Sequence, residues 1–120
     1  MRPEARRLLL ELLRHHRAVT TRNPAAQTGR IVESSYTIHY GDLCTRAGVP
    51  HIVRVVGQFL GEIAVWCRER DFPPLNSLAV NADSGIPGEG YDGAGGYRMK
   101  DWTEEVAQTV RFKGFPLEVP

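Results

Sequence analysis

The stretch that decides the fold is Ile38–Tyr91, which reads IHYGDLCTRAGVPHIVRVVGQFLGEIAVWCRERDFPPLNSLAVNADSGIPGEGY within a longer segment from Tyr36 to Gly96. Its order predicts a short helix, a tight turn, a long amphipathic helix over residues 51–70, a Pro-Pro break, one apolar strand and a Gly-rich loop. The core face of the long helix is given by apolar residues at helical spacing: Ile52, Val55, Val56, Phe59, Leu60 and Ile63.

The turns and breaks around this helix are well marked. The short helix is predicted over residues 41–47, with Gly48 at the position that caps a helix C-terminus and Pro50 just beyond it. A buried strand is predicted over residues 75–80, and residues 86–96 contain five Gly, which is typical of a loop with demanding backbone angles. This succession of elements predicts a winged helix-turn-helix.

The flanking segments predict two further helices and a short strand. Leu8, Leu9, Leu12 and Leu13 form one stripe of a basic amphipathic helix over residues 2–17, which ends at His15-His16 and is followed by a polar linker. A strand is predicted around residues 35–39, and Asp101 is predicted to begin a last helix. The fold class is thus mainly α with a small β element (α+β), divided into residues 1–30 and a winged-helix domain over residues 31–120.

Charge is unevenly distributed along the 120 residues, although the whole chain carries a formal net charge of only +1. Residues 1–30 hold seven Arg against two Glu, a local +5, whereas residues 31–120 have a local −4. Attraction of a polyanion would therefore come from the N-terminal arginines.

Neither a metal site nor a membrane segment is predicted. Cys44 and Cys67 lie among apolar residues without Cys/His ligand spacing, so buried reduced thiols in a cytoplasmic protein are expected. The run Leu8–Leu13 is too short to span a bilayer. No complete catalytic motif is present, which favours a protein that is not an enzyme and uses no cofactor.

The order of these signals resembles the DNA-binding domain of O6-alkylguanine DNA alkyltransferases and alkyltransferase-like proteins. The resemblance covers about residues 36–98, and its motifs are Tyr40-Gly41, Arg54-Val55-Val56-Gly57, Pro73-Pro74 and Gly95-Gly96-Tyr97. The family's reactive signature, Pro-Cys-His-Arg, is replaced here by Pro74-Leu75-Asn76-Ser77. The resemblance therefore implies a DNA-binding fold without alkyl transfer.

The resemblance also implies roles for two residues. Arg54 matches the arginine that fills the space left by a flipped base, and Tyr40 matches the tyrosine that presses on the DNA backbone. The predicted nucleic-acid-binding residues are Tyr40, Arg46, His51, Arg54, Asn76 and Ser77.

The sequence therefore supports three hypotheses of function. The first is a non-catalytic module that binds duplex DNA through the 51–70 helix and the N-terminal arginines. The second is a small accessory or inhibitor protein, of the mobile-element or phage type, that binds a protein partner or a second copy through the Leu8–Leu13 face. The third, an enzyme centred on Asn76 and Ser77, has the least support.

Overall fold

The computed structural model describes residues 1–25, 28–88, 91 and 99–118. In chain order the elements are α1 (Pro3–Arg22), η1 (Glu33–Ser35), β1 (Ile38–His39), α2 (Tyr40–Arg46), η2 (Pro50–Val55), α3 (Val56–Arg68), η3 (Leu75–Leu78), β2 (Ala79–Val80) and α4 (Met99–Arg111), where η marks a 3-10 helix. The prediction of a mainly helical chain with a small β element is confirmed.

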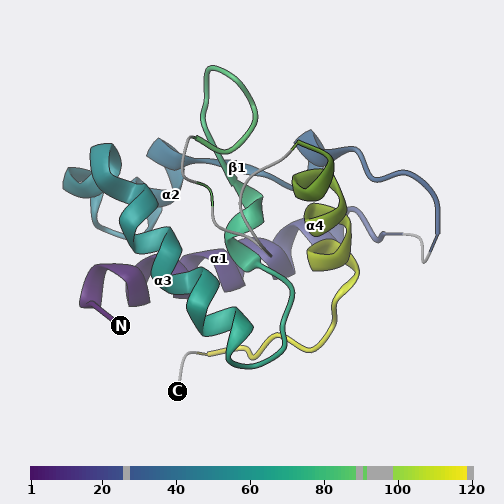
Figure 1. Cartoon of the computed structure of the whole chain (residues 1–120), viewed down its shortest axis with the longest axis horizontal. Coiled ribbons are helices and arrows are strands. Elements are labelled where there is room, and N and C mark those ends of the chain that lie inside the picture. The colour runs from purple at the N-terminus through teal and green to yellow at the C-terminus, as the bar shows by residue number, and fades with distance from the viewer. Residues whose placement is uncertain (26–27, 89–90, 92–98, 119–120) are drawn as a thin grey trace.

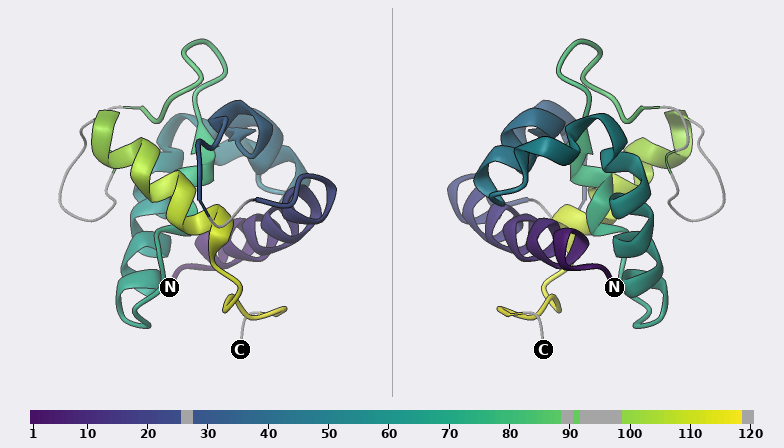
Figure 2. Two further views of the ribbon diagram at one scale, coloured as in Figure 1. Left: turned by 90° about the vertical axis from the view of Figure 1, so that its right-hand side faces the viewer. Right: turned by 90° about the vertical axis from the view of Figure 1, so that its left-hand side faces the viewer.

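The helices surround a small parallel sheet. β1 and β2 pair side by side, with Ile38 opposite Ala79 and His39 opposite Val80. In Figure 1, α2 and α3 lie on the left and α4 on the right, while α1 runs along the lower side toward both. The loop that follows β2 projects away from the rest of the molecule in each view (Figure 2).

α1 is part of the core rather than an appendage. Leu8, Leu9 and Leu12 are fully buried in the same cluster as the apolar residues of α3 and η3. The leucine stripe Leu8, Leu9, Leu12 and Leu13 thus packs against the rest of this chain, whereas Leu10 beside it is half-buried. Within the described part of the chain, no helix has the length and apolarity needed to cross a membrane.

α1 also ends five residues later than predicted, at Arg22, so the two histidines lie within the helix and not at its end. His15 and His16 are buried, and each ring donates from Nε2 to a backbone carbonyl, of Tyr36 at 2.7 Å and of Thr109 at 2.8 Å. Burial lowers the pKa of both rings. They are therefore neutral donors that hold two distant segments against α1, and not cations at a helix terminus.

Both predicted strands are shorter than expected. Only residues 38–39 and 79–80 pair, and each pair follows a 3-10 turn. In the second segment the amide of Ser77 donates to the carbonyl of Pro74 at 2.9 Å, which closes the turn of η3. All four residues of η3 are buried, and the segment contacts α1, α3 and α4.

Side chains of α4 satisfy the polar groups of this buried segment. The Thr109 hydroxyl donates to the Pro74 carbonyl at 3.1 Å, and it therefore accepts from the Ser77 hydroxyl, 3.3 Å away. The Trp102 indole donates to the Ser77 carbonyl at 2.9 Å. Since His16 donates to the Thr109 carbonyl, one fully buried residue joins α1, η3 and α4. α4 itself begins at Met99, so Asp101 lies in its first turn and not at its cap.

We expect Thr109→Val to destabilise the fold by about 1–3 kcal/mol, because it leaves the buried Ser77 hydroxyl without its partner and removes one of the two donors to the Pro74 carbonyl, while keeping the side-chain shape. Urea unfolding followed by circular dichroism measures the change. Thr21→Val is the matched control, because the exposed Thr21 hydroxyl only bonds the carbonyl of Arg17 within α1. Equal stability of the two variants would contradict this role of Thr109.

Acidification is expected to destabilise the protein through the two buried histidines. Their pKa values in the folded chain lie below 6.5, so between those values and 6.5 the unfolded chain binds more protons. The stabilisation is complete above pH 6.5 and is lost as the pH falls below it, with a slope of up to about 1.4 kcal/mol per pH unit for each ring. Unfolding in urea at pH 7.5 and at pH 5.5 measures the loss.

His16→Gln separates the histidines from other acid effects, because Gln retains an amide donor but does not titrate. This variant should lose less stability between the two pH values than the wild type. His51→Gln, which changes an exposed ring, should behave as the wild type does. An unchanged pH dependence in His16→Gln and in the corresponding His15→Gln variant would disprove the explanation.

Candidate nucleic-acid interface

The segment predicted to contact DNA begins with α2 and a tight turn. The turn closes with the amide of Gly48 donating to the carbonyl of Thr45 at 3.1 Å and that of Val49 donating to Cys44 at 2.8 Å. Gly48 has a φ of 76°, in the left-handed region that glycine adopts without strain. Gly48 therefore ends the helix as predicted. The next helical element, a 3-10 helix, begins at Pro50.

The long helix predicted over residues 51–70 is two elements in the structure. Residues 50–55 form the 3-10 helix η2, and the α-helix proper begins at Val56 and ends at Arg68. The physical reason is the density of β-branched residues at this point, because their restricted side chains disfavour the α-helix. As a result, Val55 is 44% exposed, although it was expected in the core.

The 3-10 geometry decides which side chains share the outer surface of η2. With three residues per turn, residues three apart lie on the same side, so His51 and Arg54 lie one above the other. Both are exposed, and so is Arg46 at the end of α2. These three predicted contact residues are accessible to a large ligand.

Tyr40, in contrast, is tied to the loop that follows β2. Its hydroxyl accepts a hydrogen bond from the amide of Gly88 at 2.8 Å, and a Cβ at Gly88 would lie 3.8 Å from the tyrosine ring. The side chain is half-buried. Since Tyr40 is the first residue of α2, this bond ties the Gly88 end of the loop to the helix.

Asn76 and Ser77 are not part of any surface. They are 2% and 0% exposed, because η3 passes through the interior between α1, α3 and α4. The Ser77 hydroxyl is committed to Thr109. The expectation that these two residues contact a nucleic acid therefore has no accessible surface in this fold.

An open groove of about 570 Å³ lies beside α2, and its lining combines predicted contact residues with hydroxyl groups that were not predicted as contacts. Arg14 and Arg22 of α1 and Arg46 of α2 line it, together with hydroxyl groups of the segment before β1. We call this concavity the basic groove. Its described lining is Glu11, Arg14, His15, Ala18, Val19, Arg22, Ser34, Ser35, Thr37, Ile38, His39, Asp42, Arg46 and Gly85.

The arginines of α1 reach the groove because they recur along one helical stripe. Arg7, Arg14 and Arg22 are separated by near-multiples of a helical turn, on the side of α1 opposite much of the leucine face. Arg7 extends this stripe to the turn after α2, where its Nη1 would lie 3.2 Å from a Cβ at Gly48. This periodicity was visible in the sequence, whereas the approach of residues 34–39 was not.

The charges of the groove act on one buried ring. The pKa of His15 is lowered mainly by burial, is raised by its hydrogen bond to Tyr36, and is lowered further by the charges of Arg46 and Arg22. Arg22 of α1 and Arg46 of α2 are therefore both close enough to His15 to lower its pKa. Glu11 and Asp42 also line the groove and offset two of its three arginine charges. The described lining therefore has one more cation than anions.

The two cysteines cannot supply nucleophilic chemistry in this fold. Both are free and fully buried, and burial raises the pKa of Cys44 and raises that of Cys67 to about 11. The thiols are therefore protonated at neutral pH, and the thiolate is the reactive form. No group of three or more His, Cys, Asp or Glu side chains suited to a metal ion occurs within the described residues.

The predicted wing falls largely outside the part of the chain that the structure describes. Residues 89–90 and 92–98, which include Gly95-Gly96-Tyr97, are outside it, and residues 86–88 and 91 are inside.

Comparison of the chain with protein-family models, with curated proteins and with solved structures finds no match.

Proposed function

We propose that this chain is a non-catalytic module that binds duplex DNA in the cytoplasm. The observation that supports it best is the basic groove, where arginines from α1 and α2 converge beside a run of hydroxyl groups. Phosphate oxygens accept hydrogen bonds from both kinds of donor, and such contacts position a protein on a duplex. In this proposal α2, its turn and η2–α3 act as the helix-turn-helix of an alkyltransferase-like winged helix.

The proposed interface consists of two surfaces, one that contacts phosphates and one that contacts bases. Arg14, Arg22 and Arg46 hold the phosphate backbone in the groove. His51 and Arg54, which share one exposed side of η2, face the edges of the bases. An arginine that enters the major groove pairs with guanine through two hydrogen bonds, so Arg54 is the proposed source of base discrimination.

The charge distribution sets limits on this binding. The chain has a formal net charge of only +1, so attraction comes from the local arginine cluster and not from the protein as a whole. Only a few phosphate contacts are then available. Binding should be modest in strength and should weaken steeply with salt, because each contact releases a condensed counterion.

A protein partner is the second candidate, and exposed apolar residues on η2 favour it. Val53 and Val55 are 39% and 44% exposed on either side of Arg54. Apolar side chains around an arginine are common in the centre of protein interfaces. In the DNA proposal the same valines contact thymine methyl groups instead.

We expect Arg46→Gln and Arg14→Gln each to weaken binding of a fluorescein-labelled 20-base-pair duplex by about fivefold to tenfold at 0.1 M salt, because each removes one phosphate contact. Fluorescence anisotropy measures the affinity at several salt concentrations. The slope of log K against log[salt] should decrease in magnitude by about 0.9 for each arginine removed.

Lys113→Gln is the matched control, because it removes one positive charge from an exposed residue of the C-terminal tail, away from the groove. It should bind the duplex as the wild type does. Binding that is absent, that does not depend on salt, or that falls equally in Lys113→Gln and Arg46→Gln would rule out the proposed interface. Circular dichroism checks that each variant is folded.

A further inference from the structure

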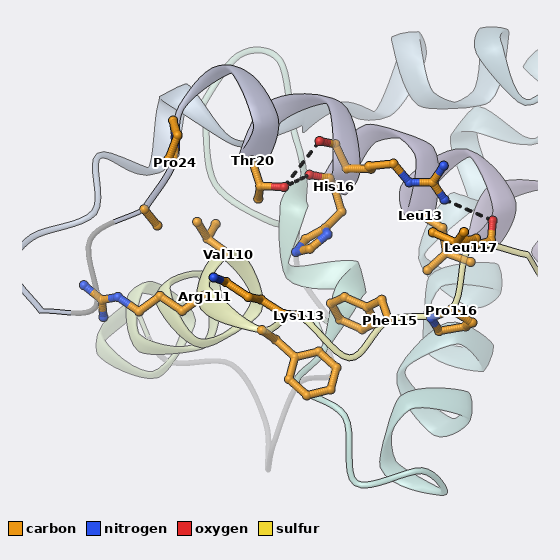
Figure 3. A pocket seen from close by; sticks show the side chains of 13 residues that line it. Leu13, His16, Thr20, Pro24, Val110, Arg111, Lys113, Phe115, Pro116 and Leu117 are labelled. Atoms are coloured by element: carbon orange, nitrogen blue, oxygen red, sulfur yellow. Dashed lines mark hydrogen bonds between the residues drawn. The ribbon is translucent and has the colours of Figure 1, made fainter.

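A second concavity lies on another side of α1 and shares no described lining residue with the basic groove. It has a volume of about 380 Å³, within the range of roughly 300–1,000 Å³ that is usual for small-molecule sites. We call it the tail pocket, because the chain after α4 closes it (Figure 3). Its described lining is Leu13, His16, Arg17, Thr20, Pro24, Ala25, Val110, Arg111, Phe112, Lys113, Phe115, Pro116 and Leu117.

The walls of the tail pocket are apolar and fixed by packing. Leu13 and Val110 are buried residues of α1 and α4. Phe115 meets the His16 ring edge-on at a centroid distance of 4.9 Å and the Phe112 ring at 4.8 Å. Figure 3 shows His16, Lys113 and Phe115 around the centre of the pocket. These contacts hold the wall in place before any ligand arrives, which limits the entropy lost on binding.

The charged groups of the pocket are all cationic. Arg17, Arg111 and Lys113 line it, and its described lining contains no carboxylate. The Arg17 guanidinium donates to the carbonyl of Leu117 at 3.3 Å, which orients the side chain without neutralising its charge (Figure 3). Arg111 donates to the carbonyl of Gly29 at 2.6 Å. His16 contributes no charge, since its ring is neutral and its Nε2 proton is held by Thr109.

We propose that the tail pocket binds a small amphipathic carboxylate. The aliphatic or aromatic part of the ligand lies among Leu13, Val110 and Phe115, and its carboxylate meets Arg17 and Lys113. An apolar pocket with a few placed polar groups is the usual form of such a site, and a guanidinium matches the geometry of a carboxylate. This proposal is independent of DNA binding, because it uses other residues of α1.

A titration of the ¹⁵N-labelled full chain with octanoate, followed by NMR, tests the proposal. Saturable shifts should appear at the amides of the pocket lining and not at those of the basic groove. Lys113→Gln should weaken octanoate binding by roughly tenfold, and Arg17→Gln/Lys113→Gln by more, because each change removes a charge-assisted contact. Binding of 1-octanol, which has the same chain and no charge, should be weak and unaffected by these variants.

Arg14→Gln removes the same charge from the groove side of α1 and should bind octanoate as the wild type does. Arg17 also holds the tail through its hydrogen bond to the carbonyl of Leu117. If the double variant is poorly folded, octanoate binding by Lys113→Gln alone tests the proposal. Absence of saturable shifts in the lining at millimolar octanoate would overturn the proposal. So would equal binding of octanoate by the wild type and Lys113→Gln, or equal shifts with inorganic phosphate, which would show a bare anion site.

Discussion

The constraint on which the rest of the structure depends is the burial of a backbone segment, η3, between three helices. A 3-10 turn in the interior has carbonyl groups that its own short helix does not satisfy. Here Trp102 of α4 donates to the carbonyl of Ser77, and Thr109 adds a second donor to the carbonyl of Pro74, which also accepts from the Ser77 amide within the turn. Once those bonds fix α4, the carbonyl of Thr109 becomes available to His16 of α1. These hydrogen bonds link α1 and α4 to the four buried residues of η3.

This arrangement leaves two sides of α1 facing concavities. Its leucines are buried in the core, so its polar residues border two separate concavities, the basic groove with Arg14 and Arg22 and the tail pocket with Arg17. The buried histidines next to these arginines hold the helix against Tyr36 on one side and Thr109 on the other. The same contacts that stabilise the fold therefore set the shape of both concavities.

Periodicity and turn chemistry in the sequence were sufficient for much of the fold. The leucine stripe of α1, the glycine cap at Gly48 and the end of α3 before Pro73 are local features, and they lie where the pattern placed them. The division of the long helix was missed because periodicity alone does not distinguish a 3-10 from an α-helical turn. The local density of β-branched residues around Val53 was the available signal.

The candidate site was less predictable, because it depends on contacts between distant segments. Arg46 and Arg54 are exposed as expected of contact residues, but Asn76 and Ser77 are buried by α4, which lies more than twenty residues further along the chain. The hydroxyl groups of residues 34–37 reach the arginines of α1 only through tertiary packing. The paired histidines were expected at the end of the first helix, but they lie within it, and their partners are backbone carbonyls that no side-chain pattern reveals.

The location of a bound duplex on the protein is the decisive measurement for the proposed interface. Backbone amide shifts of the ¹⁵N-labelled chain can be mapped during titration with a short unlabelled duplex at low salt. We expect the shifts to gather on the groove side of α1, on residues 34–46 and on η2, while α4 and the tail stay unchanged. Shifts centred on α4 and the tail, or no shifts at saturating duplex, would contradict it.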